Sequence, residues 1–385
     1  MKIFLGIILI VFCYCVFQSC KKASKSASET SIVVPQPLPN TVEKTDTLSV
    51  MAYNVLNYGN GCQGDVETLN GYFKTIIKYS QPDILSCEKM AAFPTNSTFP
   101  VNLADQINTN VLNAVFPGTY GYCGLSNQTN ATTMSVLFYN KLKLTYLKME
   151  TLESNITDFN MYKLFYNDPN LSVTHDTTFI YVIVNHTQSG SSSFARDLQV
   201  STYMNTLRAK FASFPNIISM GDFNTHNSIE KGYQSLIIST DSTTKMSDPP
   251  FYPDNSVKYP AEWESNTLGY SAFLTTSTRA LATVPNTCGT DGGAKSWYDH
   301  IFISPWLVNG SNYIKYAPNS YQTLGNDGNR LGLDINSNSP IPNNSAPADV
   351  LNALFQFSNK YPITMKLIVK ANRNAFSVTD PIEKN

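Results

Sequence analysis

The feature that most constrains the fold is a series of short apolar segments rich in Val, Ile, Phe and Tyr, which recurs along most of the chain. Segments of this length and composition are typical of buried β-strands. We predict strands at Thr47–Tyr53, Ile84–Ser86, Ser135–Tyr139, Phe179–Asn185, Asn216–Met220, His300–Ser304 and Ile363–Lys370.

Apolar residues at helical spacing lie between some of these strands and predict helices at Thr68–Tyr79, Leu103–Val115, Arg196–Phe211 and Tyr233–Ile238. Because strands and helices do not alternate strictly, the order favours two packed sheets with outer helices over a doubly wound parallel sheet. The stretches 241–295 and 305–350 are polar and rich in Gly, Pro and Asn. We expect long loops there, which usually carry function or are insertions.

Composition sets two limits. Hydrophobic residues make up 42% of the 385 residues, which is enough to bury a core. The 27 basic and 28 acidic side chains leave a net charge of −1. This balance gives no overall attraction to nucleic acid, so a DNA-degrading nuclease is disfavoured.

The N-terminus has the pattern of an export signal. Lys2 precedes the apolar run 3–17, and Ser19-Cys20 resembles a bacterial lipobox, whose cysteine is acylated and anchors the protein in the membrane. The alternative is an ordinary signal peptide cleaved nearby. We therefore predict an exported, monomeric protein, lipid-anchored at the bacterial cell envelope. Its predicted parts are a signal peptide at 1–19, a lipidated Cys20 with a flexible tether at 20–46, one α/β domain at 47–371 and a tail at 372–385.

Four cysteines follow Cys20. Cys62 and Cys123 lie in Gly-rich loop sequence and are candidates for a disulfide, which export permits. Cys87 lies in an apolar strand and is predicted to be a free, buried thiol. Since the sequence has no CxxC motif, a zinc cluster is disfavoured.

Polar residues end the first two strands. Asn54 can hold a phosphoryl oxygen or a metal-bound water there, or can simply terminate the strand. Glu88 follows a buried apolar strand, where a carboxylate is costly unless it is paired or binds a metal. It is therefore a candidate Mg²⁺ ligand. The alternative is a salt bridge with Lys89 or a distant Arg.

His186 ends a third apolar strand, where an imidazole can bind phosphate or help to protonate a leaving group. The alternative is a structural histidine. Arg196 and Gln199 follow on one predicted helix. They either support the site from behind or pair on the helix surface, and the surface pair is the favoured interpretation.

A fourth apolar strand leads into Gly221-Asp222-Phe223-Asn224. Gly221 allows a tight turn. Since Asp222 and Asn224 are two residues apart, both can face one pocket, with Asp222 as base toward water and Asn224 orienting phosphate. Asp299 begins a later strand and is a candidate to orient a histidine or to hold a second metal.

In this order, the polar clusters resemble the endonuclease/exonuclease/phosphatase superfamily, which has the DNase-I-like fold. The matching segments are YNVLNY at 53–58, PDILSCE at 82–88, VNHTQSG at 184–190, MGDFN at 220–224 and YDHIFIS at 298–304. Each is weak alone, but five in family order are specific. The resemblance covers 47–371 and implies a four-layer α/β/β/α sandwich.

The resemblance also implies roles for the site residues. Glu88 corresponds to the Mg²⁺ ligand (with Mn²⁺ as the alternative ion), and Asn54 to a residue that places metal and phosphate. His186 corresponds to a phosphate-binding residue. Asp222 and Asn224 correspond to residues that orient water and phosphate, and Asp299 to the support of the catalytic histidine.

The last motif departs from the family. Where the family has Ser-Asp-His-x-Pro, this chain reads Ser-Asn-Lys-Tyr-Pro at 358–362. The metal-binding aspartate is thus replaced by Asn359, and the catalytic histidine by Lys360, which can still bind phosphate or neutralise transition-state charge. His226 could reach the site and supply an imidazole instead, but a solvent-facing loop histidine is the favoured interpretation. His300, adjacent to Asp299 on a strand, is predicted to face away.

Two functions follow. The first is an exported, metal-dependent phosphoesterase that hydrolyses a phosphate-ester substrate, at a rate that the loss of the histidine would reduce. The second is a non-catalytic protein that binds a phosphorylated, lipid or glycan ligand in the same pocket. The identity of the ester does not follow from the fold.

Overall fold

The computed structural model describes residues 44–94, 102–251, 263, 270–282 and 288–371. The predicted signal peptide, Cys20, the tether up to residue 43 and the predicted tail at 372–385 lie outside these ranges. Within them, no helix combines the length and the apolar character needed to cross a bilayer.

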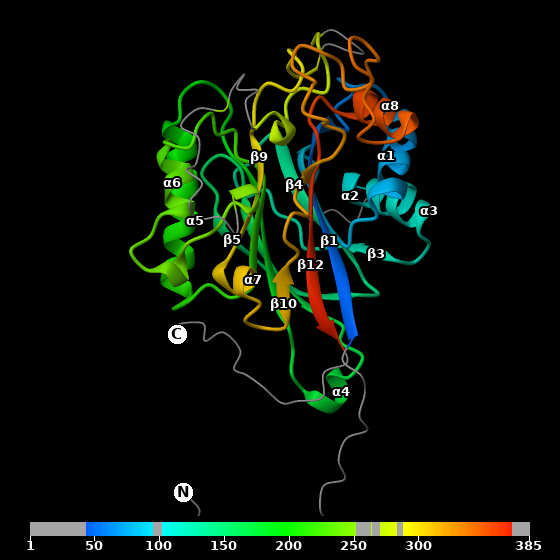
Figure 1. Cartoon of the computed structure of the whole chain (residues 1–385). Coiled ribbons are helices and arrows are strands. Elements are labelled where there is room, and N and C mark those ends of the chain that lie inside the picture. Colours follow the sequence, from blue (N-terminus) through cyan, green and yellow to red (C-terminus); the bar gives the residue numbers. More distant parts are fainter. Residues whose placement is uncertain (1–43, 95–101, 252–262, 264–269, 283–287, 372–385) are drawn as a thin grey trace, which may run out of the picture. The chain divides into compact units, whose positions relative to one another are not determined.

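The described residues form two mixed sheets that pack face to face (Figure 1). The first sheet has the order β10 (Ile314–Tyr316), β12 (Ile363–Ala371), β1 (Lys44–Tyr58), β2 (Ile84–Ala91), β4 (Thr133–Asn140) and β3 (Tyr120–Tyr122), with β11 (Gln322–Thr323) also pairing with β12. The second has the order β5 (Leu144–Glu153), β6 (Phe159–Tyr166), β7 (Phe179–His186), β8 (Ile217–Asp222) and β9 (Asp299–Ile303).

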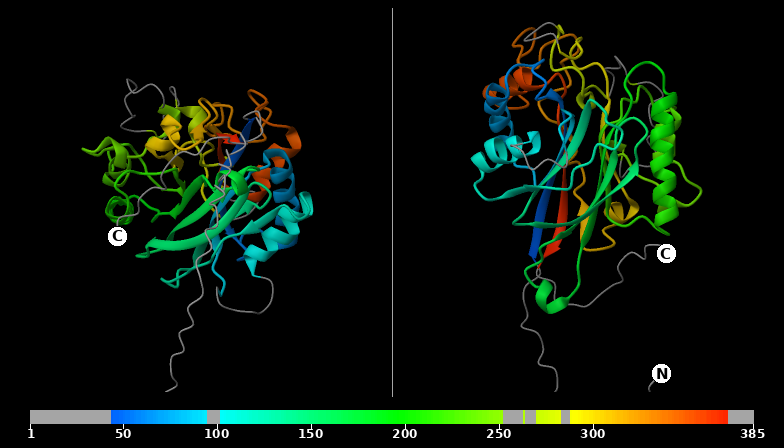
Figure 2. Two further views of the ribbon diagram at one scale, coloured as in Figure 1. Left: turned by 90° about the horizontal axis from the view of Figure 1, so that it is seen from below. Right: turned by 180° about the vertical axis from the view of Figure 1, so that it is seen from behind.

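Helices cover the outer face of each sheet, as Figures 1 and 2 show. The first sheet carries α1 (Val66–Ser80), α2 (Leu103–Ile107), a π-helical turn (Asn108–Leu112), α3 (Asn113–Val115) and α8 (Ala348–Phe357). The second carries α5 (Phe194–Lys210) and α6 (Lys231–Ile237). The remaining short helices are α4 (Leu171–Thr174), α7 (Pro305–Asn309) and the 3₁₀ turns Ser242–Thr244, Pro249–Phe251 and Ser271–Phe273. This arrangement confirms the predicted α/β/β/α sandwich.

Strand direction brings several chain positions to one end of the sandwich. In the first sheet β1 and β2 are parallel, and β12 runs antiparallel to β1. In the second sheet β7 and β8 are parallel, and β9 runs antiparallel to β8. The C-terminal ends of strands β1, β2, β7 and β8 therefore lie at the same end of the sandwich as the N-terminal ends of β9 and β12. This common strand edge is the upper end in Figure 1.

Helix α1 illustrates how local sequence positions the outer layer. Asp65 caps its N-terminus by accepting a hydrogen bond from the Thr68 amide at 2.8 Å. The buried Phe73 faces the sheet and stacks on Phe357 of α8, with 4.5 Å between ring centroids. Gln81 then adopts the left-handed conformation before Pro82 and ends the helix.

All seven predicted strands and all four predicted helices occur, with shifted ends. The prediction missed β5 and β6 in the second sheet. The edge strand β5 has mostly half-buried or exposed side chains, so it lacks a clear apolar pattern. The loop predicted across 305–350 is wrong where α7, β10, β11 and the start of α8 lie.

A disulfide joins Cys62, after β1, to Cys288 in the long loop before β9, with 5.8 Å between the Cα atoms. Cys123 is buried and free, so its prediction as a disulfide partner is wrong. The turn at Cys62 contacts a segment that is distant in sequence, which local composition does not reveal. Cys87 is buried and free, as predicted.

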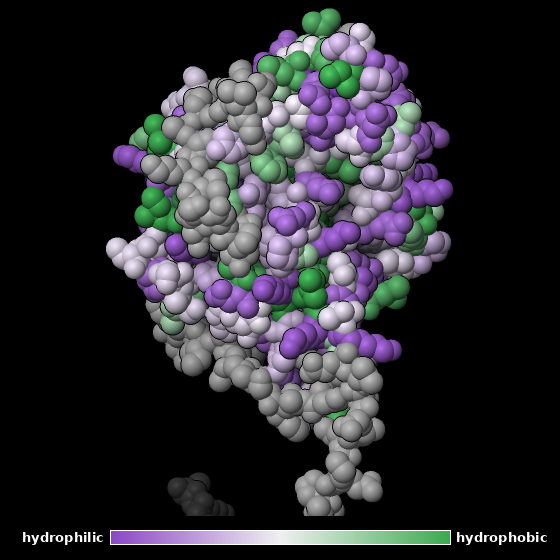
Figure 3. Space-filling model, in the orientation of Figure 1, coloured by the Kyte–Doolittle hydropathy of each residue, from purple (hydrophilic) through white to green (hydrophobic). Residues whose placement is uncertain are grey.

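The hydropathy of the surface is mixed. On the face in Figure 3, hydrophobic side chains occur in small groups between hydrophilic ones. Exposed large apolar residues are spread over several elements, for example Leu142, Phe194, Ile229 and Ile341. Singly placed apolar residues of this kind are ordinary for a protein surface and mark no interface.

We expect the disulfide to contribute strongly to stability, because it closes a loop with a sequence separation of 226. Replacing Cys62 and Cys288 together by Ala should lower the free energy of unfolding by about 2–5 kcal/mol. Scanning calorimetry of the domain measures this change.

The matched control is Cys123→Ala, which removes a thiol and leaves the disulfide intact. A reductant should lower the melting temperature of the wild type and of this control, but not that of the double variant. A double variant that melts with the wild type would contradict the prediction.

Candidate active site

The register of the strands aligns the predicted site residues. Asn54 of β1 lies opposite Glu88 of β2. In the second sheet Asp222 of β8 lies between His186 of β7 and Asp299 of β9. These residues meet across the two sheets, because the Asn54 Nδ2 donates to Asp222 Oδ2 at 2.8 Å.

The side chain of Lys360, just before β12, lies at the centre of this group. Its Nζ is 2.9 Å from Asp222 Oδ2 and 3.4 Å from Asp299 Oδ2, and it lies 4.8 Å from the ring centroid of Tyr298. Only 6% of Lys360 is exposed. The backbone of this segment is fixed because Ser358 Oγ accepts from the Lys360 amide at 3.1 Å and donates to the Asn54 carbonyl at 2.8 Å. An ammonium group thus occupies the position that the resemblance assigns to an imidazole.

The ion pair sets the charge of both partners. Burial acts to raise the pKa of Asp222, but the Lys360 ammonium, His186 and the hydrogen bonds from Lys360 and Asn54 together lower it to about 2. Burial acts in turn to lower the pKa of Lys360, and the carboxylates of Asp222 and Asp299 outweigh it and raise the pKa. At neutral pH Asp222 is therefore ionised and Lys360 is charged.

Asp299 has a different environment. Burial, together with the charge of Asp222, raises its pKa to about 7, although Lys360 and Thr275 favour the ionised form. The Thr275 hydroxyl donates to Asp299 Oδ2 at 2.6 Å and accepts from the Asp299 amide at 3.1 Å. Asp299 therefore supports Lys360, in the place where the resemblance implies support of a histidine.

Glu88 is fully buried, and neither of its carboxylate oxygens has a hydrogen-bond partner among the described residues. Burial, with the nearby Asp299 and Asp222, raises its pKa to about 8, although the nearby Ser86 hydroxyl opposes the shift. The alternative that Glu88 forms a salt bridge is therefore wrong. Lys89 adopts the left-handed conformation with φ of 58°, at the bulge that follows Glu88.

The buried carboxylate of Glu88 fits a divalent ion, since Mg²⁺ binds one or two carboxylates and otherwise waters and substrate oxygens. Asn54 Oδ1, next to it, accepts from the Leu56 amide at 2.9 Å and has a second lone pair. Asn359 does not complete such a site, because its Nδ2 donates to Thr290 Oγ1 at 2.8 Å in the neighbouring loop. Among the residues described, no group of three or more His, Cys, Asp and Glu side chains has a metal-binding arrangement.

His186 supplies the uncharged imidazole of the site. Burial lowers its pKa to about 4, with Lys89 and Lys360 acting in the same direction and Asp222 opposing them. It is therefore neutral at pH 7. A neutral imidazole can both donate and accept a hydrogen bond.

The turn after β8 is fixed by its glycine and by Asn224. A Cβ on Gly221, whose φ is +135°, would lie 2.0 Å from the Asn185 carbonyl oxygen, so the position requires glycine. The Asn224 amide donates to Asp222 Oδ1 at 3.0 Å, and its Nδ2 donates to the Thr187 carbonyl at 3.0 Å. Asn224 thus orients Asp222 through its backbone and the 187 loop through its side chain.

Arg196 and Gln199 are buried, so their prediction as a pair on the helix surface is wrong. Arg196 Nη1 donates to the Gly190 carbonyl at 2.6 Å, and its Nη2 pairs with Glu230 at 2.9 Å. Gln199 Oε1 accepts from the Gln188 amide at 2.9 Å. Both side chains hold the loop after His186 from behind the site, because that loop folds over the start of α5.

Two further histidines, His300 in β9 and His226 after β8, lie in different environments. His300 is fully buried, with its Nδ1 3.3 Å from Asp248 Oδ2, and stacks on Trp297, which confirms that it faces away from Asp222. The ring of His226 lies 5.1 Å from that of Tyr298, at the rim of the site. Neither occupies the position of Lys360.

Residue-level reasoning missed Thr275, Tyr298 and Ser358 as parts of the site. Thr275 lies in a long polar stretch without any motif, so no sequence signal marks it. Tyr298 and Ser358 belong to the motifs at 298–304 and 358–362. Their positions next to Asp299 and close to Lys360 are the sequence signal that could have identified them.

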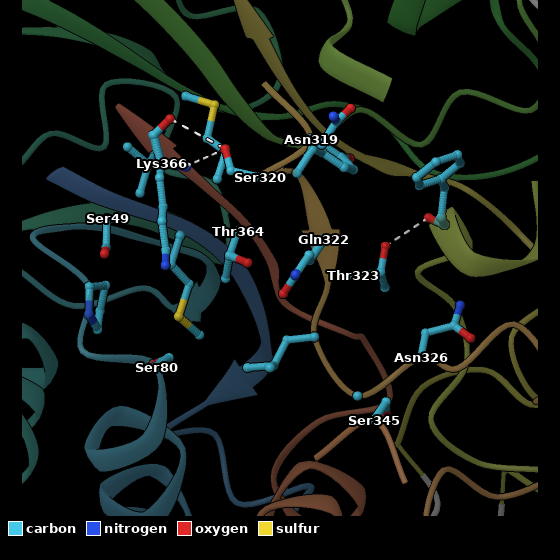
Figure 4. Close-up of a pocket in the computed structure, with 18 of the residues that line it drawn as sticks. Ser49, Ser80, Asn319, Ser320, Gln322, Thr323, Asn326, Ser345, Thr364 and Lys366 are labelled. Atoms are coloured by element: carbon cyan, nitrogen blue, oxygen red, sulfur yellow. Dashed lines mark hydrogen bonds between the residues drawn. The ribbon is translucent and has the colours of Figure 1, made fainter. Parts of the chain in front are cut away.

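A further cavity lies away from this site. It has a volume of about 690 Å³ between β1, β12 and the 318–326 segment, and Ser49, Thr364 and Lys366 line it (Figure 4). Among the described residues that line it there is one lysine and no carboxylate. It therefore lacks the grouped ionisable side chains of a catalytic site.

No family model matches the chain, and no curated protein matches it. Solved structures do. TDP2 of D. rerio, complexed with a single-strand DNA product, matches with a TM-score of 0.50 and 11% identity over 84% of this chain and 99% of that chain. An endonuclease/exonuclease/phosphatase family protein of Bacteroides thetaiotaomicron matches at 0.48, with 13% identity over 85% and 99%. The human Nocturnin catalytic domain with bound sulfate matches at 0.47, with 13% identity over 85% and 96%.

At these identities the likeness concerns the fold. TDP2 belongs to the endonuclease/exonuclease/phosphatase superfamily, and its fold extends over most of this chain. The chain therefore has the DNase-I-like fold, which confirms what the sequence motifs implied.

In the metal-free protein, we expect Glu88 to make stability fall as pH rises. Its pKa is raised from 4.5 to about 8, so the folded chain binds the proton more tightly than the unfolded chain. The free energy of unfolding should therefore decrease between about pH 4.5 and pH 8. Glu88→Gln should be more stable than the wild type at pH 8 and close to it at pH 5, as measured by thermal melting with a chelator.

The exposed Glu67→Gln in the first turn of α1 is the control and should follow the wild-type profile. Adding Mg²⁺ at pH 8 should raise the melting temperature of the wild type and of Glu67→Gln more than that of Glu88→Gln. Parallel pH profiles for all three proteins would show that Glu88 is not the group responsible.

Proposed function

We propose that this chain is a phosphoesterase-type hydrolase that acts outside the cytoplasm with the help of a divalent metal ion. The observation that supports the proposal most is the buried group at the common strand edge. There the Lys360 ammonium lies 2.9 Å from Asp222, beside the unpartnered carboxylate of Glu88. These groups match a site that receives an anionic phosphoryl group and a cation together.

The side chains of the site suggest different roles in the hydrolysis of a phosphate ester. Lys360, held by Asp222 and Asp299, stabilises the negative charge that develops on the phosphoryl oxygens. His186, neutral at pH 7, donates a hydrogen bond to a phosphoryl oxygen. Asp222, oriented by Asn54 and Asn224, positions the attacking water.

A Mg²⁺ or Mn²⁺ ion would be held by Glu88 and by Asn54 Oδ1. When bound, such an ion polarises the phosphoryl group and neutralises its charge. It would also favour the ionised form of Glu88, whose pKa burial raises in the metal-free chain.

The setting of the enzyme is part of the proposal. The net charge of −1 argues against a nucleic-acid substrate, so we propose a smaller phosphate ester. The Cys62–Cys288 disulfide supports an oxidising, extracytoplasmic location. We further propose attachment to the membrane through a lipid on Cys20, and a monomeric state, in keeping with the scattered exposed apolar residues.

A second candidate function is binding of a phosphorylated, lipid or glycan ligand without catalysis. One observation favours it. The ion pair with Lys360 lowers the pKa of Asp222 to about 2, which makes that carboxylate a weak base, and Lys360 itself is held in the charged form. The proton transfer that a histidine would provide then has no strong substitute.

Hydrolysis of an aryl phosphodiester with Mg²⁺ or Mn²⁺ discriminates between the two functions. If the chain is an enzyme, the wild type should turn over, and Asp222→Ala should lose about 10²–10⁴-fold in rate. Binding of inorganic phosphate, measured by calorimetry, reports on the pocket independently of turnover.

Lys360→His restores the family residue, and Lys366→His, on an exposed part of β12, is its matched control. A silent wild type that gains activity only through Lys360→His would support the binding function. Turnover by the wild type that Asp222→Ala abolishes would exclude it.

A further inference from the structure

A second polar cavity lies directly beside Lys360, in the long loop region before β9. It encloses about 450 Å³. Its lining includes three hydroxyl side chains, a tyrosine, a lysine and a glycine: Thr276, Gly289, Thr290, Lys295, Ser296 and Tyr298. A cavity of this size can enclose a small organic group.

Backbone pairing joins this cavity to the reaction centre. Thr276 pairs with Lys360 in an antiparallel bridge. On either side of that bridge, the Tyr361 amide donates to the Thr275 carbonyl at 2.8 Å, and the Thr278 amide donates to the Asn359 carbonyl at 3.0 Å. Tyr298 belongs to both places, because it lines the cavity and its ring contacts the Lys360 ammonium. A group attached to a phosphoryl group at Lys360 is therefore within reach of the cavity.

Among the described residues, Thr276 Oγ1 and Asn359 Oδ1 are buried atoms without a hydrogen-bond partner, and Asn359 lies behind the residues that line the cavity. The side-chain amide of Asn359 lies against Gly289. A Cβ added to Gly289 would come within 2.6–2.9 Å of the atoms of that amide. Its Nδ2 holds Thr290 Oγ1 at 2.8 Å. Asn359 thus positions Thr290, which lines the cavity and whose hydroxyl can still donate a hydrogen bond to a ligand.

The charges around the cavity cancel. Lys295 Nζ lies 3.6 Å from Asp291 Oδ1, and both residues line the cavity. No other charged side chain is among its described lining residues. The cavity therefore suits an uncharged, polar group better than a second phosphate, because an additional anion would meet a lysine that is already neutralised.

The cavity is also held in shape. Cys288 directly precedes Gly289, and its disulfide to Cys62 ties the cavity wall to the segment after β1. Arg279 Nη1 donates to the Cys288 carbonyl at 3.3 Å, and its Nη2 donates to Gln63 Oε1 at 3.2 Å. A rigid wall lowers the cost of ordering when a ligand binds.

We propose that this cavity is a binding subsite for the uncharged, hydroxyl-rich group of the phosphate ester, such as a sugar or another polyol. The proposal rests on the proposed function, because the phosphoryl group must bind at Lys360. Thr290 and Tyr298, which line the cavity, recognise the hydroxyl groups, and the substrate class is a sugar phosphate or polyol phosphate.

Two ligands with the same phosphoryl group test the subsite, methyl phosphate and glucose 1-phosphate. Their dissociation constants are measured by calorimetry with the full domain and Mg²⁺. The wild type should bind glucose 1-phosphate at least tenfold more tightly. Thr290→Val removes a hydroxyl, and Ala282→Leu fills the cavity. Each should weaken glucose 1-phosphate binding about fivefold or more and leave methyl phosphate unchanged.

Thr206→Val on the outer helix α5 is the matched control and should change neither constant. Equal affinity of the wild type for the two ligands would overturn the subsite while leaving the proposed function intact. An equal loss for both ligands in Thr290→Val and Ala282→Leu would overturn it as well. If neither ligand and no inorganic phosphate binds, the proposed function fails, and the subsite fails with it.

Discussion

The contact on which the site depends is the buried ion pair between Lys360 and Asp222. Lys360 precedes β12 of the first sheet, and Asp222 ends β8 of the second, so the pair connects the two sheets at their common edge. Asp222 Oδ2 also accepts from Asn54 of β1. Removing one partner would leave a buried charge unpaired, which costs roughly 3–5 kcal/mol in typical cases. The ion pair between Lys360 and Asp222 therefore determines the placement of these side chains, their charge and part of the stability of the site together.

The fold was largely predictable because its central strands are short, apolar and end in polar residues. β1, β2, β7 and β8 are buried on both faces and give uninterrupted apolar segments, whereas the edge strand β5 does not. Of the elements missed within 305–350, β10 and β11 form by pairing with β12, and α8 packs against α1, so local sequence does not reveal them. The same holds for Cys288, whose partner is 226 residues away.

The site was predictable as a set of residues but not as a set of contacts. Motif order placed Asn54, Glu88, His186, Asp222 and Asp299 at one edge, and the structure brings them together. The sequence left open whether Glu88 is paired, and the structure shows that neither carboxylate oxygen has a hydrogen-bond partner among the described residues. The support by Arg196 depends on the loop at 187–193 folding over α5, which helical periodicity does not indicate.

Both changed residues of the motif at 358–362 have a physical role in the structure. Lys360 places a positive charge between two carboxylates. Asn359 turns its side-chain amide toward Gly289 and donates from Nδ2 to Thr290 Oγ1, and these two residues line the neighbouring cavity. An aspartate at 359 could not donate this hydrogen bond, and its charge would be buried. The two residues thus place a fixed cation at the centre and a neutral amide behind the adjacent cavity, a combination that suits a phosphate ester with a neutral polar group.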